Sequence, residues 1–112
     1  MQVLVRTDHN IEGREALADR ITDVVERALT RVRDRITRVE VHLSDENSDK
    51  KGGGLDMRCV IEARLEGRPP VAVTDHAATM DQAVSGATHK LARSLDRVFG
   101  RLHDKRSRGS EK

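Results

Sequence analysis

Cationic side chains recur at helical spacing in two separate stretches of this chain. The C-terminal stripe consists of Lys90, Arg93, Arg97 and Arg101, and the N-terminal stripe consists of Arg20, Arg27 and Arg31. At about 100° per residue, each set falls within an arc of roughly 80° or less on a helix surface. Because a guanidinium fork binds phosphate oxygens in bidentate geometry, arginines aligned in this way favour a polyanionic partner.

The charges around the stripes distinguish a binding surface from one that is only solvated. A charged helix face is usually just a solvated face. The acidic residues Asp19, Asp23 and Glu26, however, are predicted to lie on the flank away from the N-terminal stripe. Salt bridging along a helix would interleave the signs instead. We therefore predict that both stripes bind a partner, and that they border a common groove if the two helices lie side by side.

The overall charge balance hides a local excess of cations. The formal net charge is only +2, yet residues 90–108 hold seven lysines and arginines against two aspartates. A basic patch on a nearly neutral body indicates a nucleic acid or another polyanion as partner. Phe99 is the only Phe, Tyr or Trp in the chain, which argues against binding by bases stacked on aromatic platforms.

No other residue set has the spacing of a catalytic or metal site. The histidines are scattered, and none pairs with a second ligand at metal-binding spacing. Asp75 and His76 are adjacent, but no serine or cysteine accompanies them in a nucleophile motif. Cys59 is predicted to be a small buried hydrophobe, and the glycines at 52–54 lack the lysine of a phosphate loop. We therefore expect a protein that is not an enzyme and that needs no metal or other cofactor.

Hydrophobic periodicity predicts the elements that position the stripes. Strands are expected at 2–6, 38–43, 55–65 and 71–74, and helices are expected at 17–32 and 79–103. Strict alternation divides the side chains of the third strand into two sets. The apolar set is predicted to face the helices: Met57, Cys59, Ile61 and Ala63. The opposite set is predicted to face solvent: Arg58, Glu62 and Arg64. The order β-α-β-β-β-α predicts an α+β two-layer sandwich. Two helices would cover one face of a four-stranded mixed sheet, as in double-stranded-RNA-binding domains.

The second helix has a clear start and an unusual interior residue. Thr79, followed three residues later by Gln82, fits a capping box. Gly86 costs about 1 kcal/mol of helix stability relative to alanine, so close packing against a neighbour is expected there. The apolar pattern predicts the end of the helix near His103.

The domain organisation is expected to be simple. Residues 1–103 are predicted to form one domain, with a mobile loop at 44–54 and a disordered basic tail at 104–112. A single cysteine excludes an internal disulfide bond. No segment approaches the ~18–20 apolar residues that span a bilayer, so we expect a cytoplasmic protein.

Two segments resemble the ribosome hibernation promoting factor family, which includes the ribosome-associated translation inhibitors and sigma-fifty-four modulation proteins. Residues 34–44, DRITRVEVHLS, resemble the end of that family's first helix and its second strand. Residues 80–97, MDQAVSGATHKLARSLDR, resemble its last helix. The family's Lys-Leu-x-Arg-x-Leu-x-Lys/Arg pattern is filled by Lys90, Leu91, Arg93, Leu95 and Arg97. The order of elements matches the family across residues 1–103.

The resemblance implies that the protein binds the small ribosomal subunit near the decoding region. A factor there excludes messenger RNA and transfer RNA and so inhibits translation in ribosome hibernation under stress. The resemblance also implies that Lys90, Arg93 and Arg97 face ribosomal RNA. The resemblance is to the short form of the family, which lacks the second domain that pairs two ribosomes. A monomer with no membrane or small-molecule partner is therefore expected. Two features depart from the family pattern: Asp81 replaces a usual tyrosine, and the 44–54 loop is longer and more acidic.

Two other functions remain open on the sequence alone. The arginine stripes of a protein-interaction module would bind an acidic partner, such as a transcription regulator. A small ferredoxin-like enzyme would need a catalytic pocket that the sequence does not reveal. Co-sedimentation with small ribosomal subunits at low salt distinguishes the ribosomal function from the first of these.

Overall fold

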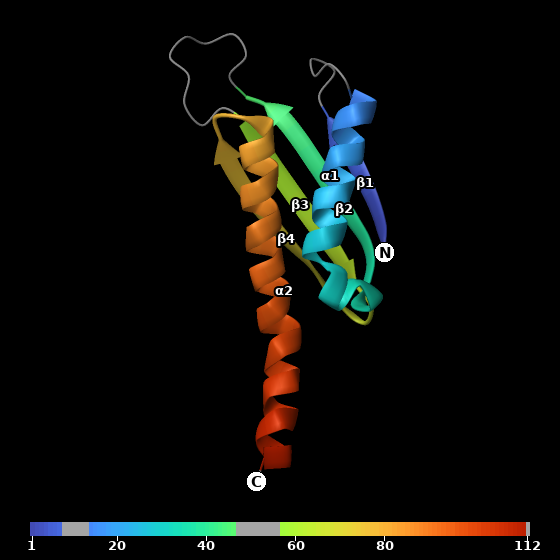
Figure 1. The fold of residues 1–112 in the computed structure, drawn as a ribbon, viewed down its shortest axis with the longest axis vertical. Coiled ribbons are helices and arrows are strands. Elements are labelled where there is room, and N and C mark those ends of the chain that lie inside the picture. Colours follow the sequence, from blue (N-terminus) through green and yellow to red (C-terminus); the bar gives the residue numbers. More distant parts are fainter. Residues whose placement is uncertain (8–13, 47–56, 112) are drawn as a thin grey trace.

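The fold is known from a computed structural model, which describes the backbone of residues 1–7, 14–46 and 57–111 and the side chains of 1–7, 15–46 and 57–100. In chain order the elements are β1 (Gln2–Thr7), α1 (Arg14–Ala28), the 3₁₀-helix η1 (Thr30–Arg35), β2 (Ile36–Asp45), β3 (Met57–Leu65), β4 (Arg68–Ala77) and α2 (Met80–Glu111) (Figure 1). Apart from the short η1, this is the predicted β-α-β-β-β-α order.

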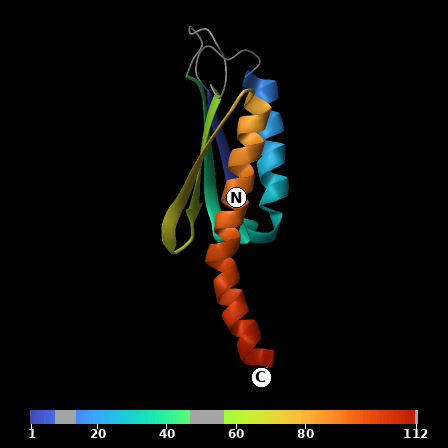
Figure 2. The ribbon, with the colours of Figure 1, turned by 90° about the vertical axis from the view of Figure 1, so that its left-hand side faces the viewer.

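The four strands form one mixed sheet in the order β1-β2-β3-β4. β1 runs parallel to β2, and the remaining neighbours are antiparallel. Both helices lie on the same face of this sheet, and its other face is open (Figure 2). The predicted α+β two-layer architecture is therefore confirmed.

The register of β3 matches the predicted alternation. Cys59, Ile61 and Ala63 are fully buried under the helices, and Met57 packs against the same core. Arg58, Glu62 and Arg64 lie on the open face at partly or fully exposed positions. A slip of one residue would exchange these two sets, so burial of the apolar set fixes the register.

The helices supply the other half of the core. Leu17, Ile21 and Val25 of α1 recur at i, i+4 and i+8, and Leu91 and Leu95 of α2 have the same spacing; all five are at most 5% exposed. Burying each such leucine or isoleucine contributes about 1.5–3 kcal/mol. This packing holds both helices firmly against the sheet.

Thr79 and Gly86 behave as predicted. The backbone N–H of Gln82 donates to Thr79 Oγ1 over 3.1 Å, so Thr79 caps the start of α2. A Cβ at Gly86 would collide with the carboxylate of Asp75 on β4. Gly86 therefore allows α2 to approach the edge strand closely.

Three strands are longer than predicted, β1 by the single residue Thr7 and the other two by more. β2 begins at Ile36 and continues to Asp45, into the segment predicted as a loop, whereas 47–54 of that loop lie outside the described residues. β4 begins at Arg68 rather than at residue 71, although Pro69 and Pro70 lack backbone N–H groups. β4 pairs only with β3, and an edge strand tolerates proline because one side of it needs no partner.

The predicted end of the second helix is wrong. α2 continues past His103 to Glu111 and extends beyond the sheet (Figure 1). The added residues include Lys105, Arg106 and no proline, and lysine and arginine are good helix formers. The periodicity argument ended the helix where the apolar residues end, but a helix needs no core contact at every turn. Disorder of 104–112 in solution stays a prediction.

Candidate nucleic-acid interface

The N-terminal stripe is largely neutralised within the protein. Arg20 reaches across to α2 and pairs with Asp81 at 3.2 Å. Arg27 pairs with Asp23 one turn earlier, at 3.1 Å. The prediction that Asp23 lies on the opposite flank is therefore wrong, because residues four apart are neighbours on a helix surface. Arg31 is exposed and lies in η1, beyond the end of α1.

The two stripes do not border a common groove. The hollow between the helices, about 270 Å³, is lined by Arg20, Ile21, Val24, Asp81, Val84 and Ser85. It contains no member of the C-terminal stripe whose side chain the structure describes. At about 100° per residue, Lys90 lies roughly 140° around α2 from Ser85. The C-terminal stripe therefore lies on the side of α2 away from α1.

Lys90 is exposed, but its ammonium group is already bonded to other residues of the protein. Its Nζ donates to the backbone carbonyl of Thr74 and to Asp75 Oδ1, each at 3.0 Å. The Asp75 side chain is 25% exposed, and it occupies the space left by Gly86. Lys90 and Asp75 thus fasten α2 to β4.

Cys59 lies beside the same aspartate and has no catalytic character. It pairs with Asp75 across β3 and β4. Burial first, and the negative charge of Asp75 second, raise the pKa of the Cys59 thiol to about 12. A thiol with this pKa stays protonated and unreactive at neutral pH.

Three of the seven predicted cations are exposed and unpaired. Arg93, Arg97 and Arg31 form no ion pair with any side chain between residues 1 and 100 that the structure describes. Arg97 only shares a 3.4 Å hydrogen bond with Ser94 Oγ. The side chain of Arg101 lies outside the described residues. Arg93 and Arg97 are therefore the available cations of the C-terminal stripe.

Sequence reasoning missed three further unpaired arginines. Arg33, Arg35 and Arg68 are exposed and form no ion pair among the described side chains. Arg35 and Arg68 lie over the ring of Phe99, at 5.0 and 5.8 Å from its centroid. No periodicity could reveal this cluster, because its members come from η1, from the start of β4 and from α2.

The open face of the sheet carries cations of a different kind. Three arginines surround the half-buried Glu40: Arg38 at 3.1 Å, Arg64 at 3.7 Å and Arg6 at 3.8 Å. Arg58 and His76 both lie near Glu46, at 3.9 and 3.3 Å. The arginines of this face are therefore paired with carboxylates.

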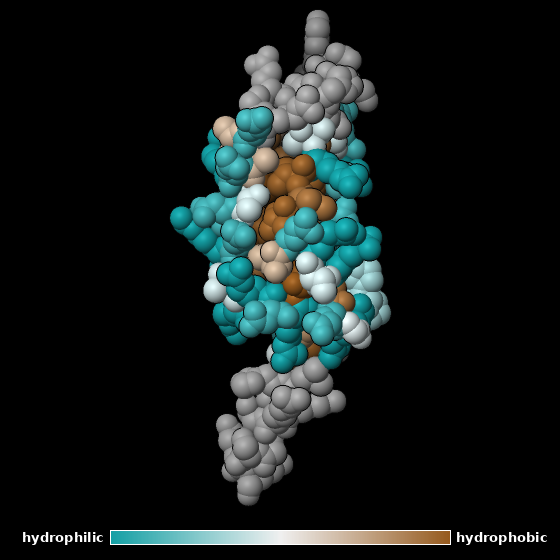
Figure 3. Space-filling view, turned by 90° about the vertical axis from the view of Figure 1, so that its right-hand side faces the viewer, coloured by the Kyte–Doolittle hydropathy of each residue, from teal (hydrophilic) through white to brown (hydrophobic). Residues whose placement is uncertain are grey.

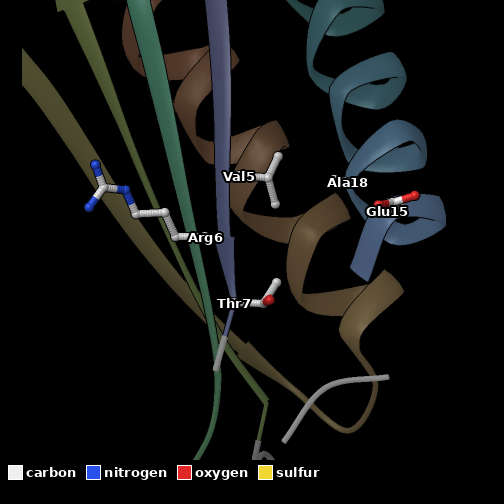
Figure 4. Close-up of a pocket in the computed structure, with 5 residues that line it drawn as sticks. All are labelled: Val5, Arg6, Thr7, Glu15 and Ala18. Atoms are coloured by element: carbon white, nitrogen blue, oxygen red, sulfur yellow. The ribbon is translucent and has the colours of Figure 1, made fainter. Parts of the chain in front are cut away.

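An apolar hollow lies between β1 and α1. Its volume is about 430 Å³, and Val5, Arg6, Thr7, Glu15 and Ala18 line it. Apolar surface is visible on this flank in Figure 3, and Figure 4 shows Arg6 pointing to the opposite side of the sheet from Val5 and Thr7. The lining offers no convergent set of nucleophile, acid and base.

The residues that the structure describes contain no group of three or more His, Cys, Asp or Glu side chains placed to hold a metal ion. Within the same residues, neither α1 nor α2 is long and apolar enough to cross a membrane.

Comparison with known proteins agrees with the fold and the sequence motifs. The N-terminal domain of Protein Y from Thermus thermophilus superposes with a TM-score of 0.69 at 24% identity, covering 88% of this chain and 99% of that one. A ribosomal subunit interface protein from Coxiella burnetii gives a TM-score of 0.65 at 18% identity, covering 89% and 99%. A search of curated protein sequences gives no match. The family described as sigma 54 modulation protein / S30EA ribosomal protein matches residues 4–103. The resemblance inferred from the sequence is thus confirmed, and the chain belongs to this family of ribosome-associated factors.

Proposed function

We propose that this protein binds the small ribosomal subunit near the decoding region and blocks translation by excluding messenger RNA and transfer RNA. Membership of a ribosome-associated family supports this, as do the neighbours in fold, which are described as Protein Y and as a ribosomal subunit interface protein. The observation that carries the proposal is the pair Arg93 and Arg97 on α2. Both are exposed and unpaired among the described residues, at motif positions that imply contact with ribosomal RNA.

α2 presents these two arginines at a fixed spacing. Residues four apart on a helix lie about 6 Å apart along its axis. Leu91 and Leu95 are fully buried beneath them, and the contacts of Lys90 with β4 hold the same turn. The guanidinium groups therefore meet RNA without first ordering the backbone, which lowers the entropic cost of binding.

Affinity in this proposal comes from phosphate neutralisation. Each cation that contacts a phosphate releases condensed counterions, so binding weakens as salt rises. The positions of phosphates and the shape of the RNA then place the domain, with little reading of base sequence. Inhibition follows from occupying space, so the protein acts without catalysis, as a monomer and in the cytoplasm, where ribosomes are found.

The test is co-sedimentation of the purified protein with purified small subunits, together with inhibition of translation in a reconstituted system. We expect binding at low salt, inhibition of translation, and a loss of affinity of at least about tenfold in R93E/R97E. R6E/R58E is the matched control, since it makes the same change of charge on the open face; it should bind like the parent.

Two results would contradict the proposal. If the parent protein fails to sediment with small subunits at low salt, the ribosomal function is wrong. Binding instead to an acidic protein would then favour an interaction module. If R93E/R97E binds subunits as tightly as the parent, the role of the C-terminal stripe is wrong.

A further inference from the structure

The ring of the single phenylalanine of this chain is contacted by two arginines from distant parts of the sequence. The guanidinium carbons of Arg35 and Arg68 are 5.0 and 5.8 Å from the centroid of the Phe99 ring. The ring itself is 9% exposed and belongs to the core. Both arginines are exposed, so their free N–H groups remain accessible to a partner.

The backbone holds the two arginines in fixed relation. The N–H of Glu66, in the turn before β4, donates to the carbonyl of Arg35 over 3.1 Å. Gly67 closes this turn with a φ of +69°, a conformation that glycine adopts without strain. At the end of η1, the N–H of Ile36 donates to the carbonyl of Arg33. Neither arginine therefore depends on a mobile segment for its position.

The charge of this cluster has no ion-pair partner among the side chains that the structure describes. Asp34 and Glu66 are the nearest acids in sequence, yet neither forms an ion pair with Arg35 or Arg68. Two cations held over one ring repel each other, and an anion bound between them would relieve that repulsion.

We propose that Arg35 and Arg68, held over Phe99, form a second phosphate-binding site that takes a backbone phosphate of ribosomal RNA. This inference rests on the proposed function, which supplies the RNA. Residues two apart on a helix lie about 200° apart around its axis, so Phe99 is on the opposite side of α2 from Arg97, and the site is a contact separate from Arg93 and Arg97. Paired guanidinium groups suit a phosphate, since each fork can donate two parallel hydrogen bonds.

The test measures binding to purified small subunits at several salt concentrations. The double variant R35Q/R68Q should bind more weakly than the parent at low salt. Its plot of log affinity against log salt should be flatter by about 0.7–0.9 for each lost contact. R35K/R68K keeps the positive charge but removes the guanidinium fork, so its affinity should lie between those of the parent and R35Q/R68Q. The matched control R6Q/R58Q removes the same charge from ion-paired positions and should behave like the parent.

Phe99 provides an independent variant. F99L keeps an apolar side chain in the core but removes the ring that orients the two arginines, and we expect weaker binding than the parent with an unchanged salt slope. The thermal unfolding midpoint of each variant, measured alongside, identifies any loss of binding that comes from unfolding. If R35Q/R68Q does not fold, R35K/R68K, which keeps the charge, tests the site instead: weaker binding than the parent supports it, and equal binding contradicts it.

The outcomes separate this inference from the proposed function. If the parent binds small subunits and R93E/R97E does not, while R35Q/R68Q matches the parent in affinity and slope, the second site is wrong and the function stands. If the parent does not bind small subunits at all, both are wrong.

Discussion

The open face of the sheet and the outer face of α2 carry the same kind of side chain in opposite circumstances. On the sheet, Arg6, Arg38 and Arg64 converge on Glu40 within 3.8 Å. On α2, Arg93 and Arg97 have no carboxylate partner among the described residues. A count of arginines would rank the sheet face at least as high as the helix, so the number of cations does not identify a binding surface.

The difference lies in local net charge rather than in the strength of the pairs. An exposed ion pair contributes only about 0.2–1 kcal/mol, so a phosphate could in principle displace a carboxylate. Displacement, however, leaves the carboxylate next to the phosphate, and the two anions repel each other. Arginines that hold no carboxylate partner gain counterion release without that cost. For the proposed function, the absence of an ion-pair partner within the fold is therefore a better guide to candidate RNA contacts than the number of arginines.

The largest effect is expected from substitution of Gly86. G86A places a Cβ against the carboxylate of Asp75, so either the helix or the aspartate must move. We expect a loss of about 1–3 kcal/mol in unfolding free energy, even though alanine favours the helix. Chemical denaturation measures this. G100A is the matched control: a Cβ there meets open space, and it should stabilise the protein by up to about 1 kcal/mol. Equal effects of the two changes would contradict this prediction and would show that the Asp75 side chain turns aside at little cost.

A smaller effect is expected from Lys90, which sharpens the comparison because it belongs to the C-terminal stripe but is paired. K90Q and D75N should each lower the free energy of unfolding by about 0.5–1 kcal/mol, since the pair is partly exposed. The double variant should lose less than the sum of the two. K90Q should also leave the salt dependence of subunit binding nearly unchanged. A drop in salt slope equal to that of R93Q would place Lys90 among the RNA contacts and break the division between paired and unpaired cations.

The smallest effect is expected from removal of the C-terminal segment. A chain that ends after His103 should melt within about 2 °C of the parent, since residues 104–112 contain no apolar side chain to bury. Differential scanning calorimetry measures the midpoint. A clear drop would mean that the cations of this segment interact with the domain and belong with the paired set.

The sequence predicted the fold well because its signals are local. Alternation from Met57 to Leu65 determined the inner face of β3, and i, i+4 spacing determined the inner face of both helices. The end of α2 was misplaced because the periodic signal measures contact with a core, and a helix can continue without one. The pairing of Arg27 with Asp23 was within reach of the sequence, since the two are four residues apart.

The candidate site was only partly predictable. Arg93 and Arg97 emerged from their spacing alone. The partners of Lys90 and Arg20 did not, because Asp75 and Asp81 come from other parts of the fold. The cluster over Phe99 combines three elements, so only the tertiary structure could reveal it.

The most direct test of the account compares neutralised arginines on the two faces. Binding to purified small subunits would be measured across a salt series for the parent, R93Q/R97Q and R6Q/R64Q. The two variants carry the same net charge, because each replaces two arginines by glutamine. We predict that R93Q/R97Q lowers the salt slope by about 1.4–1.8, while R6Q/R64Q keeps the slope of the parent. Equal loss of slope in both variants would mean that net charge alone governs binding, and would contradict the claim that pairing within the fold selects the RNA-binding face.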